Sequence, residues 1–405
     1  MFDNLLYQNV AALLKDDIAH GRLPGALLLA GPDSSGKLTC ALEIARILSC
    51  TAAESRGRWQ CDCPSCRKHK ELSSTNVLLA GPRDCALEIL AAKNTFLAAV
   101  AQDAPYLTAA RYLFVRAVRK LTMRFSQVLW EDDEKVSKIA PVVQAIDEQL
   151  EQIDGTKPLP GYERTEKIAA ELVKQTEKLE SAFMYDSLPI QQIRRAAVWA
   201  HLRSPDGKKV FIIEHADRMN EAARNALLKM LEEPPSDAVF ILTTSRRGAV
   251  MPTILSRVRT YQFAQRTERQ QAEVIARVFH ADASAGEGTI DGFLQTYLPV
   301  TPAAVQEHAR AFYASVEKGA FPVMGDIVKG CAGFEPRLLF RLFLTGILGA
   351  QMTGELTAQA GESAAKNVDA LRICYNNVTV YNQTPGAALE ALWRDLFAVR
   401  RAERH

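Results

Sequence analysis

The chain has 405 residues, of which 48% are hydrophobic and 24% are charged, and its formal net charge at pH 7 is +2. This length allows two or three domains that each bury a core, in an ordinary soluble globular protein. The near-neutral charge excludes binding to nucleic acid or acidic lipid through a global field, so any such binding needs local basic patches.

The N-terminal segment carries early acids and no small-residue cleavage site, so we expect no secretory signal. Apolar residues at helical spacing predict a helix within residues 1–24, which Gly21 and Pro24 end. No apolar stretch reaches transmembrane length. We therefore expect a cytoplasmic protein without a membrane span.

Short apolar runs alternate with helical patterns in much of the chain. Runs bounded by turn residues predict strands that are buried on both faces, at residues 26–30, 76–80, 209–213 and 238–244. Helical patterns cover residues 189–203 and 220–232. This alternation predicts an α/β fold with a doubly wound parallel sheet.

Residues 84–183 interrupt the alternation with helical patterns. Apolar residues repeat at spacings of three and four over residues 139–153 and again over 168–179, on either side of a turn signal. We therefore predict an inserted helical hairpin that serves as a spacer or binds a protein. After residue 266, helical patterns predict a small domain over 266–327 and a C-terminal domain over 328–405.

A glycine-rich turn follows the first predicted strand. Gly31, Gly36 and Lys37 form a phosphate-loop pattern, in which backbone N–H groups, a helix N-terminus and an ammonium group face phosphates. The next residue should carry a hydroxyl for Mg²⁺, but it is Leu38, and the side chain of Thr39 points about 100° away on a helix. The pattern predicts ATP binding with poor magnesium ligation, and a glycine turn that binds no ligand is the alternative.

The strand at 209–213 ends in a second nucleotide-type motif. Glu214 can hold magnesium, but His215 stands where a carboxylate would polarise the attacking water. A neutral imidazole is a weaker base there, and we favour the interpretation that His215 only ends the strand. Together with Leu38, this motif predicts a nucleotide site that hydrolyses ATP poorly.

Cys50, Cys61, Cys63 and Cys66 place four thiols within seventeen residues. A tetrahedral structural zinc site satisfies this spacing, and thiols without metal are the alternative. The C-x-C pair is tighter than the usual C-x2-C, so His69 could replace one ligand. The other cysteines are expected to be ordinary core residues.

Several segments, taken in chain order, resemble the bacterial clamp-loader family of DNA polymerase III. They are HGRLPGALLLAGPDSSGKLT, the four cysteines, KVFIIEHADRMNEAARNALLKMLEEPPSDAVFILTTS and PTILSRV. The resemblance implies a P-loop (AAA+) core over residues 1–265 with a zinc module at 50–66, an all-α lid at 266–327 and an oligomerisation collar at 328–405. Motor subunits of the gamma/tau type would keep GK[ST] and an Asp-Glu pair, so the chain is most similar to the delta-prime type.

The resemblance also assigns roles to two residues beyond these motifs. Ser256-Arg257-Val258 aligns with the family's Ser-Arg-Cys motif, which implies that Arg257 is an arginine finger for a neighbouring subunit's ATP. Thr244 falls at the sensor position, where a hydroxyl contacts γ-phosphate, and it could equally be a packing residue.

The implied function is that of a largely non-hydrolysing scaffold in a hetero-oligomer with gamma/tau and delta subunits, which loads the sliding clamp on primed DNA. One alternative is an ATP-hydrolysing gamma/tau-like motor, in which Thr39, Glu214 and His215 take displaced roles. Another is a zinc-bearing helicase loader or signalling ATPase. The sequence contains no paired carboxylates in a context suited to two-metal nucleotidyl transfer, so polymerisation itself is not expected of this chain.

Overall fold

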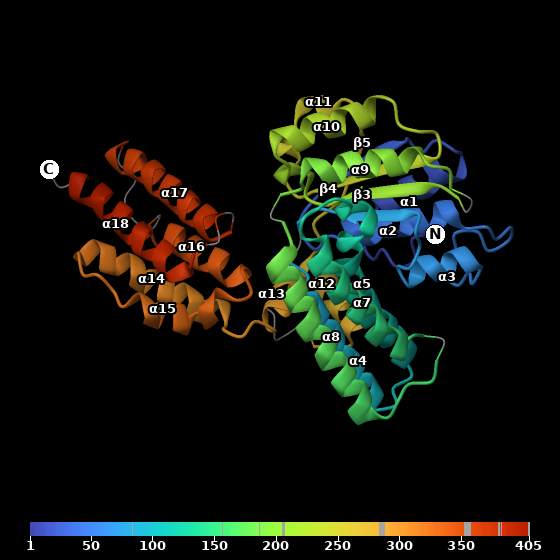
Figure 1. Cartoon of the computed structure of the whole chain (residues 1–405), viewed down its shortest axis with the longest axis horizontal. Coiled ribbons are helices and arrows are strands. Elements are labelled where there is room, and N and C mark those ends of the chain that lie inside the picture. The colour runs from blue at the N-terminus through green and yellow to red at the C-terminus, as the bar shows by residue number, and fades with distance from the viewer. Residues whose placement is uncertain are drawn as a thin grey trace. The chain divides into compact units, whose positions relative to one another are not determined.

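The computed structural model places two compact units, Met1–Leu294 and Gln295–His405 (Figure 1). Within the described part of the chain, no helix combines the length and the apolar character needed to cross a membrane. The described residues are 1–82, 84–155, 157–185, 187–204, 207–282, 288–351, 358–379, 381 and 383–403.

The first unit is built on a parallel sheet in the order β2-β3-β4-β1-β5. Every residue of the first four strands is buried, which explains their largely apolar sequences. Because all pairs are parallel, the carboxyl ends of the strands meet at one edge of the sheet. The strands are β1 (Ala26–Ala30), β2 (Val77–Ala80), β3 (Lys209–Ile213), β4 (Ala238–Thr244) and β5 (Arg259–Gln262).

Helices cover both faces of this sheet (Figure 1). Leu28 of β1 contributes to a core with α9 (Ile190–His201) and α10 (Glu221–Glu232), and its sequence neighbours contribute to a second core with α1 (Val10–Ala19) and α2 (Lys37–Ser49). This division follows from the alternation of side chains along a strand.

Shorter elements connect or extend this layered core. They are α3 (Pro64–Lys70), η2 (Ala216–Arg218), η3 (Arg247–Ala249), α11 (Pro252–Leu255), α12 (Glu268–Phe279) and α13 (Ile290–Gln295).

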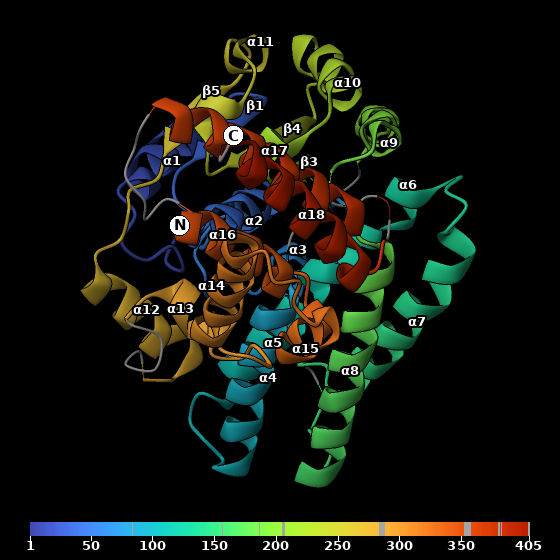
Figure 2. The ribbon, with the colours of Figure 1, turned by 90° about the vertical axis from the view of Figure 1, so that its left-hand side faces the viewer.

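The insertion is a helical bundle rather than a two-helix hairpin. The helix α7 packs against α8, α8 also packs against α4, and α4 packs against α5. Figure 2 shows α4, α7 and α8 extending from the sheet. Buried residues of these helices belong to the same core as one face of the sheet, so the insertion is not a separate domain. Its elements are α4 (Ala86–Ala101), α5 (Leu107–Thr122), η1 (Met123–Phe125), α6 (Gln127–Trp130), α7 (Val136–Gln152) and α8 (Tyr162–Phe183).

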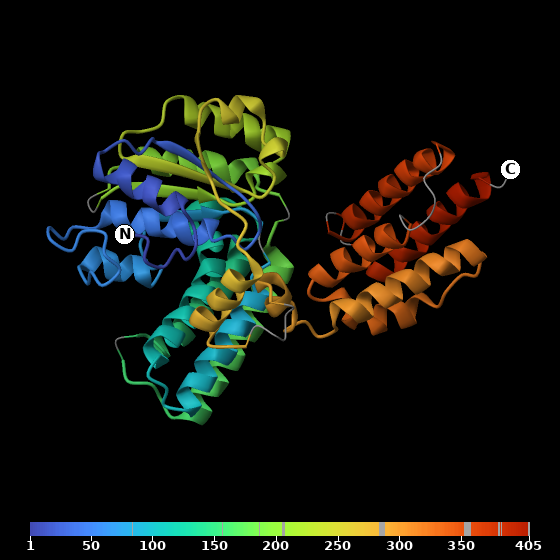
Figure 3. The same ribbon diagram turned by 180° about the vertical axis from the view of Figure 1, so that it is seen from behind.

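The second unit is a group of helices, drawn in orange and red in Figure 3. The helix α14 packs against α16 and α17 packs against α18. The boundary between the units lies inside the range 266–327, so α12 groups with the sheet while α14 and α15 group with the later helices. The elements are α14 (Pro302–Lys318), α15 (Met324–Gly330), η5 (Ala332–Phe334), α16 (Leu338–Gln351), α17 (Ala358–Thr379) and α18 (Pro385–Glu403).

Candidate nucleotide and metal sites

The phosphate loop joins β1 to α2 at the carboxyl edge of the sheet. Gly36 has a φ of 95°, which L side chains rarely adopt, and a Cβ on Gly31 would lie 2.6 Å from the Cβ of Phe263. Backbone conformation and close packing therefore require these two glycines, independently of any ligand.

Two cations hold the loop through its carbonyl groups. The Lys37 ammonium donates to the carbonyl of Gly31 at 2.7 Å and also to that of Pro32. The Arg266 guanidinium donates to the carbonyl of Ser34 at 2.6 Å. For Lys37 to bind a phosphate, its ammonium would have to exchange these carbonyls for phosphate oxygens.

Leu38 occupies the position where a magnesium-binding hydroxyl was expected. It is 6% exposed and belongs to the hydrophobic core that contains Leu27, Leu29 and α1. Leu38 therefore contributes packing rather than a ligand. Thr39, at the next position, is half-buried on the same helix.

Glu214, the acid expected to hold magnesium, forms a buried ion pair with Arg124 of the insertion. Glu214 is 5% exposed and Arg124 is 3% exposed. The Arg124 guanidinium also donates to the carbonyl of Gly81 at 3.0 Å. Sequence reasoning missed Arg124, because it lies 90 residues before Glu214 in a segment without a recognisable motif.

The sensor-position hydroxyl of Thr244 belongs to a network at the end of β4. It donates to Asp217 Oδ1 at 2.8 Å, and Arg246 Nη2 lies 3.0 Å from Asp217 Oδ2. Burial raises the pKa of Asp217, but the hydrogen bonds from Thr244 and Arg246 outweigh burial, and its pKa is lowered. Burial, followed by the charge of Arg218, lowers the pKa of His215, which keeps its ring neutral.

Arg257 lies near the opposite, amino edge of the sheet. Arg259, two residues later, pairs with Leu27 near the start of β1, whereas the phosphate loop follows the end of β1. A strand of this length spans about 13 Å, which separates Arg257 from the loop of its own chain. Arg257 is exposed, and its guanidinium lies 2.9 Å from Glu232 Oε1 and donates to the carbonyl of Thr253 at 2.8 Å.

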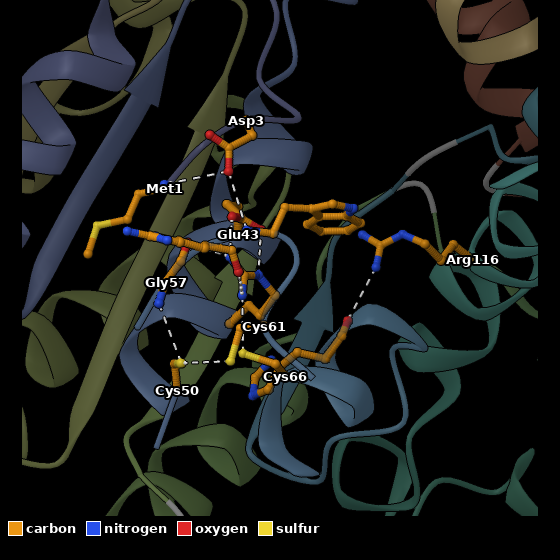
Figure 4. Close-up of polar contacts among 12 residues, drawn as sticks. Met1, Asp3, Glu43, Cys50, Gly57, Cys61, Cys66 and Arg116 are labelled. Carbon is orange, nitrogen blue, oxygen red and sulfur yellow. Dashed lines mark hydrogen bonds and ion pairs between the residues drawn. The ribbon is translucent and has the colours of Figure 1, made fainter. Parts of the chain in front are cut away.

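The four predicted metal ligands come together in one cluster, and Figure 4 shows three of them, Cys50, Cys61 and Cys66. The Sγ atoms of Cys50, Cys61, Cys63 and Cys66 all lie within 4.8 Å of one another, and those of Cys50 and Cys61 are 3.7 Å apart. Sulfur atoms that bind one zinc ion tetrahedrally are about 3.8 Å apart. The residues therefore fit a metal ion.

Hydrogen-bond donors surround these sulfur atoms. The backbone N–H of Cys66 donates to Cys63 Sγ at 3.4 Å, and Arg46 Nη1 donates to Cys66 Sγ at 3.1 Å. Burial raises the pKa of Cys63, but hydrogen bonds from the backbone of Cys66 and Thr51 outweigh burial and bring its pKa to about 6. Burial raises the pKa of the Cys66 thiol. At Cys63 the donors therefore favour the thiolate, which is the form that binds metals.

Arg46 connects the phosphate-loop helix α2 to the cysteine module. It is 1% exposed, pairs with Glu43 at 2.6 Å and donates to the carbonyl of Gly57 at 2.8 Å. A buried cation with several partners fixes the loop that carries the cysteines onto α2.

His69 lies outside the cluster of four ligands, although sequence reasoning considered it as a substitute. It is 4% exposed, and burial, followed by the charges of Arg46 and Arg116, lowers its pKa to about 4. Arg116 of α5 donates to the carbonyls of His69 and Lys70 at 3.2 and 2.5 Å. The insertion thus caps the end of α3, the helix that carries Cys66, through Arg116 (Figure 4).

The parallel sheet, with a phosphate-type loop at its carboxyl edge, defines an α/β protein of the P-loop (AAA+) class. The family model described as DNA polymerase III, delta subunit, matches residues 7–142 and 163–267, more than half of the chain. The chain belongs to this family, and with it to the clamp-loader proteins of DNA polymerase III. The match takes in α4, α5 and most of α8, which the sequence motifs had left outside the resemblance.

Known relatives match shorter stretches. DNA polymerase III subunit gamma/tau of Mycobacterium bovis is 36% identical over 88 residues, which are 22% of this chain and 15% of the relative. Subunit delta' of Bacillus subtilis is 46% identical over 56 residues, 14% of this chain and 17% of the relative. Subunit delta' of Pseudomonas aeruginosa is 49% identical over 51 residues, which are 13% of this chain and 16% of the relative. This chain thus matches about a sixth of each relative's length.

Proposed function

We propose that the chain is a clamp-loader subunit of the delta-prime type. It would be a largely non-hydrolysing AAA+ scaffold that donates Arg257 to ATP on a neighbouring subunit. Its partners would be gamma/tau and delta subunits, in a cytoplasmic, replisome-associated hetero-oligomer that loads the sliding clamp on primed DNA. Family membership and the names of its relatives support this role.

The observation that carries the proposal is the contrast between the two edges of the sheet. At the carboxyl edge, Leu38 is buried in the core and Glu214 is paired with Arg124. At the amino edge, Arg257 is exposed. A chain with a buried leucine at the usual magnesium-ligand position and a paired acid at the end of β3, but with an exposed arginine at the other edge, suits a donor better than a motor.

The surroundings of Arg257 are suitable for an arginine finger. Its ion pair with Glu232 lies at the surface, where such pairs contribute about 0–1 kcal/mol, so exchanging the carboxylate for phosphate costs little. A guanidinium stays charged and binds two phosphate oxygens at once. In phosphoryl transfer it neutralises the charge that develops on the γ-phosphate.

The remaining sites take supporting roles in this proposal. Cys50, Cys61, Cys63 and Cys66 would hold a structural zinc ion, which keeps the module folded against α2. Gly31, Gly36 and Lys37 would permit ATP binding without efficient hydrolysis. The C-terminal helices would form the oligomerisation collar. We place its start near residue 295, because the second compact unit begins there rather than at residue 328.

A gamma/tau-like motor is the second candidate, because several relatives carry that name. ATP turnover by the purified chain separates the two. We expect magnesium-dependent hydrolysis at background level that Lys37→Ala does not change, with Lys15→Ala, an exposed lysine of α1, as the matched control. Steady hydrolysis that Lys37→Ala alone abolishes would establish the motor instead.

A further inference from the structure

The insertion reaches into the nucleotide-type site through one side chain. Arg124 belongs to η1, directly after α5, and its guanidinium contacts both Glu214 at the end of β3 and the carbonyl of Gly81 after β2. The side chains of Arg124 and Glu214 are 2% and 6% exposed. The pair is therefore an interior contact between the insertion and the carboxyl edge of the sheet.

The backbone of Arg124 is fixed by an aromatic stack. Trp130 Nε1 donates to the carbonyl of Arg124 at 2.7 Å. The Trp130 ring is stacked with Phe125 and Tyr185, at centroid distances of 5.3 and 5.2 Å. Because Trp130 is almost fully buried, the core of the insertion sets the position of the guanidinium.

A divalent cation at this edge would need the carboxylate of Glu214. Mg²⁺ binds through carboxylate oxygens and demands regular geometry. The guanidinium already supplies positive charge at that carboxylate. Admitting a metal would leave a buried arginine without its counter-charge, which is strongly unfavourable.

We infer that Arg124 stands in for the divalent cation at Glu214, so that the phosphate loop of this chain holds nucleotide without magnesium. The insertion is then an internal part of the site that determines its metal dependence. The inference rests on the proposed function only in treating the phosphate loop as a nucleotide site.

Binding of fluorescent ADP to the full chain, with Mg²⁺ or with EDTA, tests this inference. For the wild type, we expect the affinity for ADP in Mg²⁺ and the affinity for ADP in EDTA to agree within about twofold. A loss of at least about tenfold on adding EDTA would overturn the inference. Absence of ADP binding at millimolar concentration in both conditions would overturn it as well. This comparison uses the wild type alone, so it tests the inference even if a substitution prevents the variants from folding.

Variants assign the effect to Arg124. Leu38→Ser restores a hydroxyl at the magnesium position, and alone it should leave ADP binding insensitive to EDTA. Adding Arg124→Met should make binding at least about tenfold weaker in EDTA, and Glu214→Gln in that background should abolish the difference. Leu38→Ser with Arg194→Met, an exposed arginine of α9, is the matched control.

Two outcomes with the variants would overturn the inference. In one, Leu38→Ser alone makes ADP binding depend on magnesium; in the other, a folded Leu38→Ser/Arg124→Met chain gains no such dependence. The role of Arg257 is measured separately, in the reconstituted complex. Failure of the metal inference therefore leaves the proposed function standing, and failure of the proposed function leaves the ADP result standing.

Discussion

Replacing Glu180 with glutamine should stabilise the protein at alkaline pH. Glu180 lies near the end of α8, and its Oε1 accepts the backbone N–H of Cys85 at 2.7 Å, at the start of α4. The residue is half-buried, but its Oε2 is shielded from solvent and has no hydrogen-bond partner among the described residues. Burial raises the pKa of Glu180 to about 7, because it outweighs the backbone hydrogen bonds that act to lower this pKa.

The sign and size of the effect follow from this raised pKa. Between its ordinary value of 4.5 and about 7, the folded chain binds the proton more tightly than the unfolded chain, so stability falls as pH rises through this window. The two pKa values differ by about 2.5, which corresponds to about 3 kcal/mol. Glutamine keeps the acceptor for Cys85 and removes the charge. Glu180→Gln should therefore gain up to about 3 kcal/mol at a pH of about 8 and almost nothing at a pH of about 4.5.

Urea unfolding followed by tryptophan fluorescence at several pH values measures this difference in the free energy of unfolding. Glu177→Gln, which removes an exposed carboxylate from the same helix, is the matched control and should change stability little at any pH. The reasoning would be refuted if Glu180→Gln were no more stable than the wild type at high pH, or if its gain were the same at every pH.

Three further perturbations test other parts of the structure. Metal analysis should find about one zinc ion per chain, and Cys66→Ser should lower this content while Cys85→Ser, a buried thiol outside the cluster, keeps it; metal-free wild-type protein would contradict the zinc assignment. Arg116→Met removes donors from the carbonyls at the end of α3 and should lower the free energy of unfolding by about 1–3 kcal/mol, so an unchanged urea midpoint would argue against this cap. Glu232→Gln breaks an exposed pair and should change the free energy of unfolding by less than about 1 kcal/mol in the same assay, and a larger loss would mean that Glu232 is structural.

Sequence patterns located the first four strands because each is buried on both faces and reads as an apolar run. They missed β5, whose sequence RTYQ has Tyr261 alone buried. An edge strand of this kind lacks the apolar run that identifies the others. The domain boundary near residue 295 was also missed, because helical periodicity shows which face of a helix is apolar but does not identify the helix that covers it.

The cysteine cluster was predictable because its ligands are close in sequence, and the structure brings all four together. The partners that decide the chemistry of the nucleotide-type site were not predictable in this way. Arg124 reaches Glu214 from a distant segment, and the pair of Arg257 with Glu232 joins the turn after α11 to the end of α10. Such contacts depend on tertiary packing, which spacing along one chain does not encode.

The role of Arg257 is tested most directly by clamp-stimulated ATP hydrolysis on primed DNA, in a complex reconstituted from gamma/tau, delta and this chain. Arg257→Ala should assemble normally and lower hydrolysis at the neighbouring site, and with it clamp loading, by at least about tenfold. Arg269→Ala, an exposed arginine of α12, should match the wild type. Undiminished hydrolysis and clamp loading by the Arg257→Ala complex would contradict the proposal that this chain donates an arginine finger.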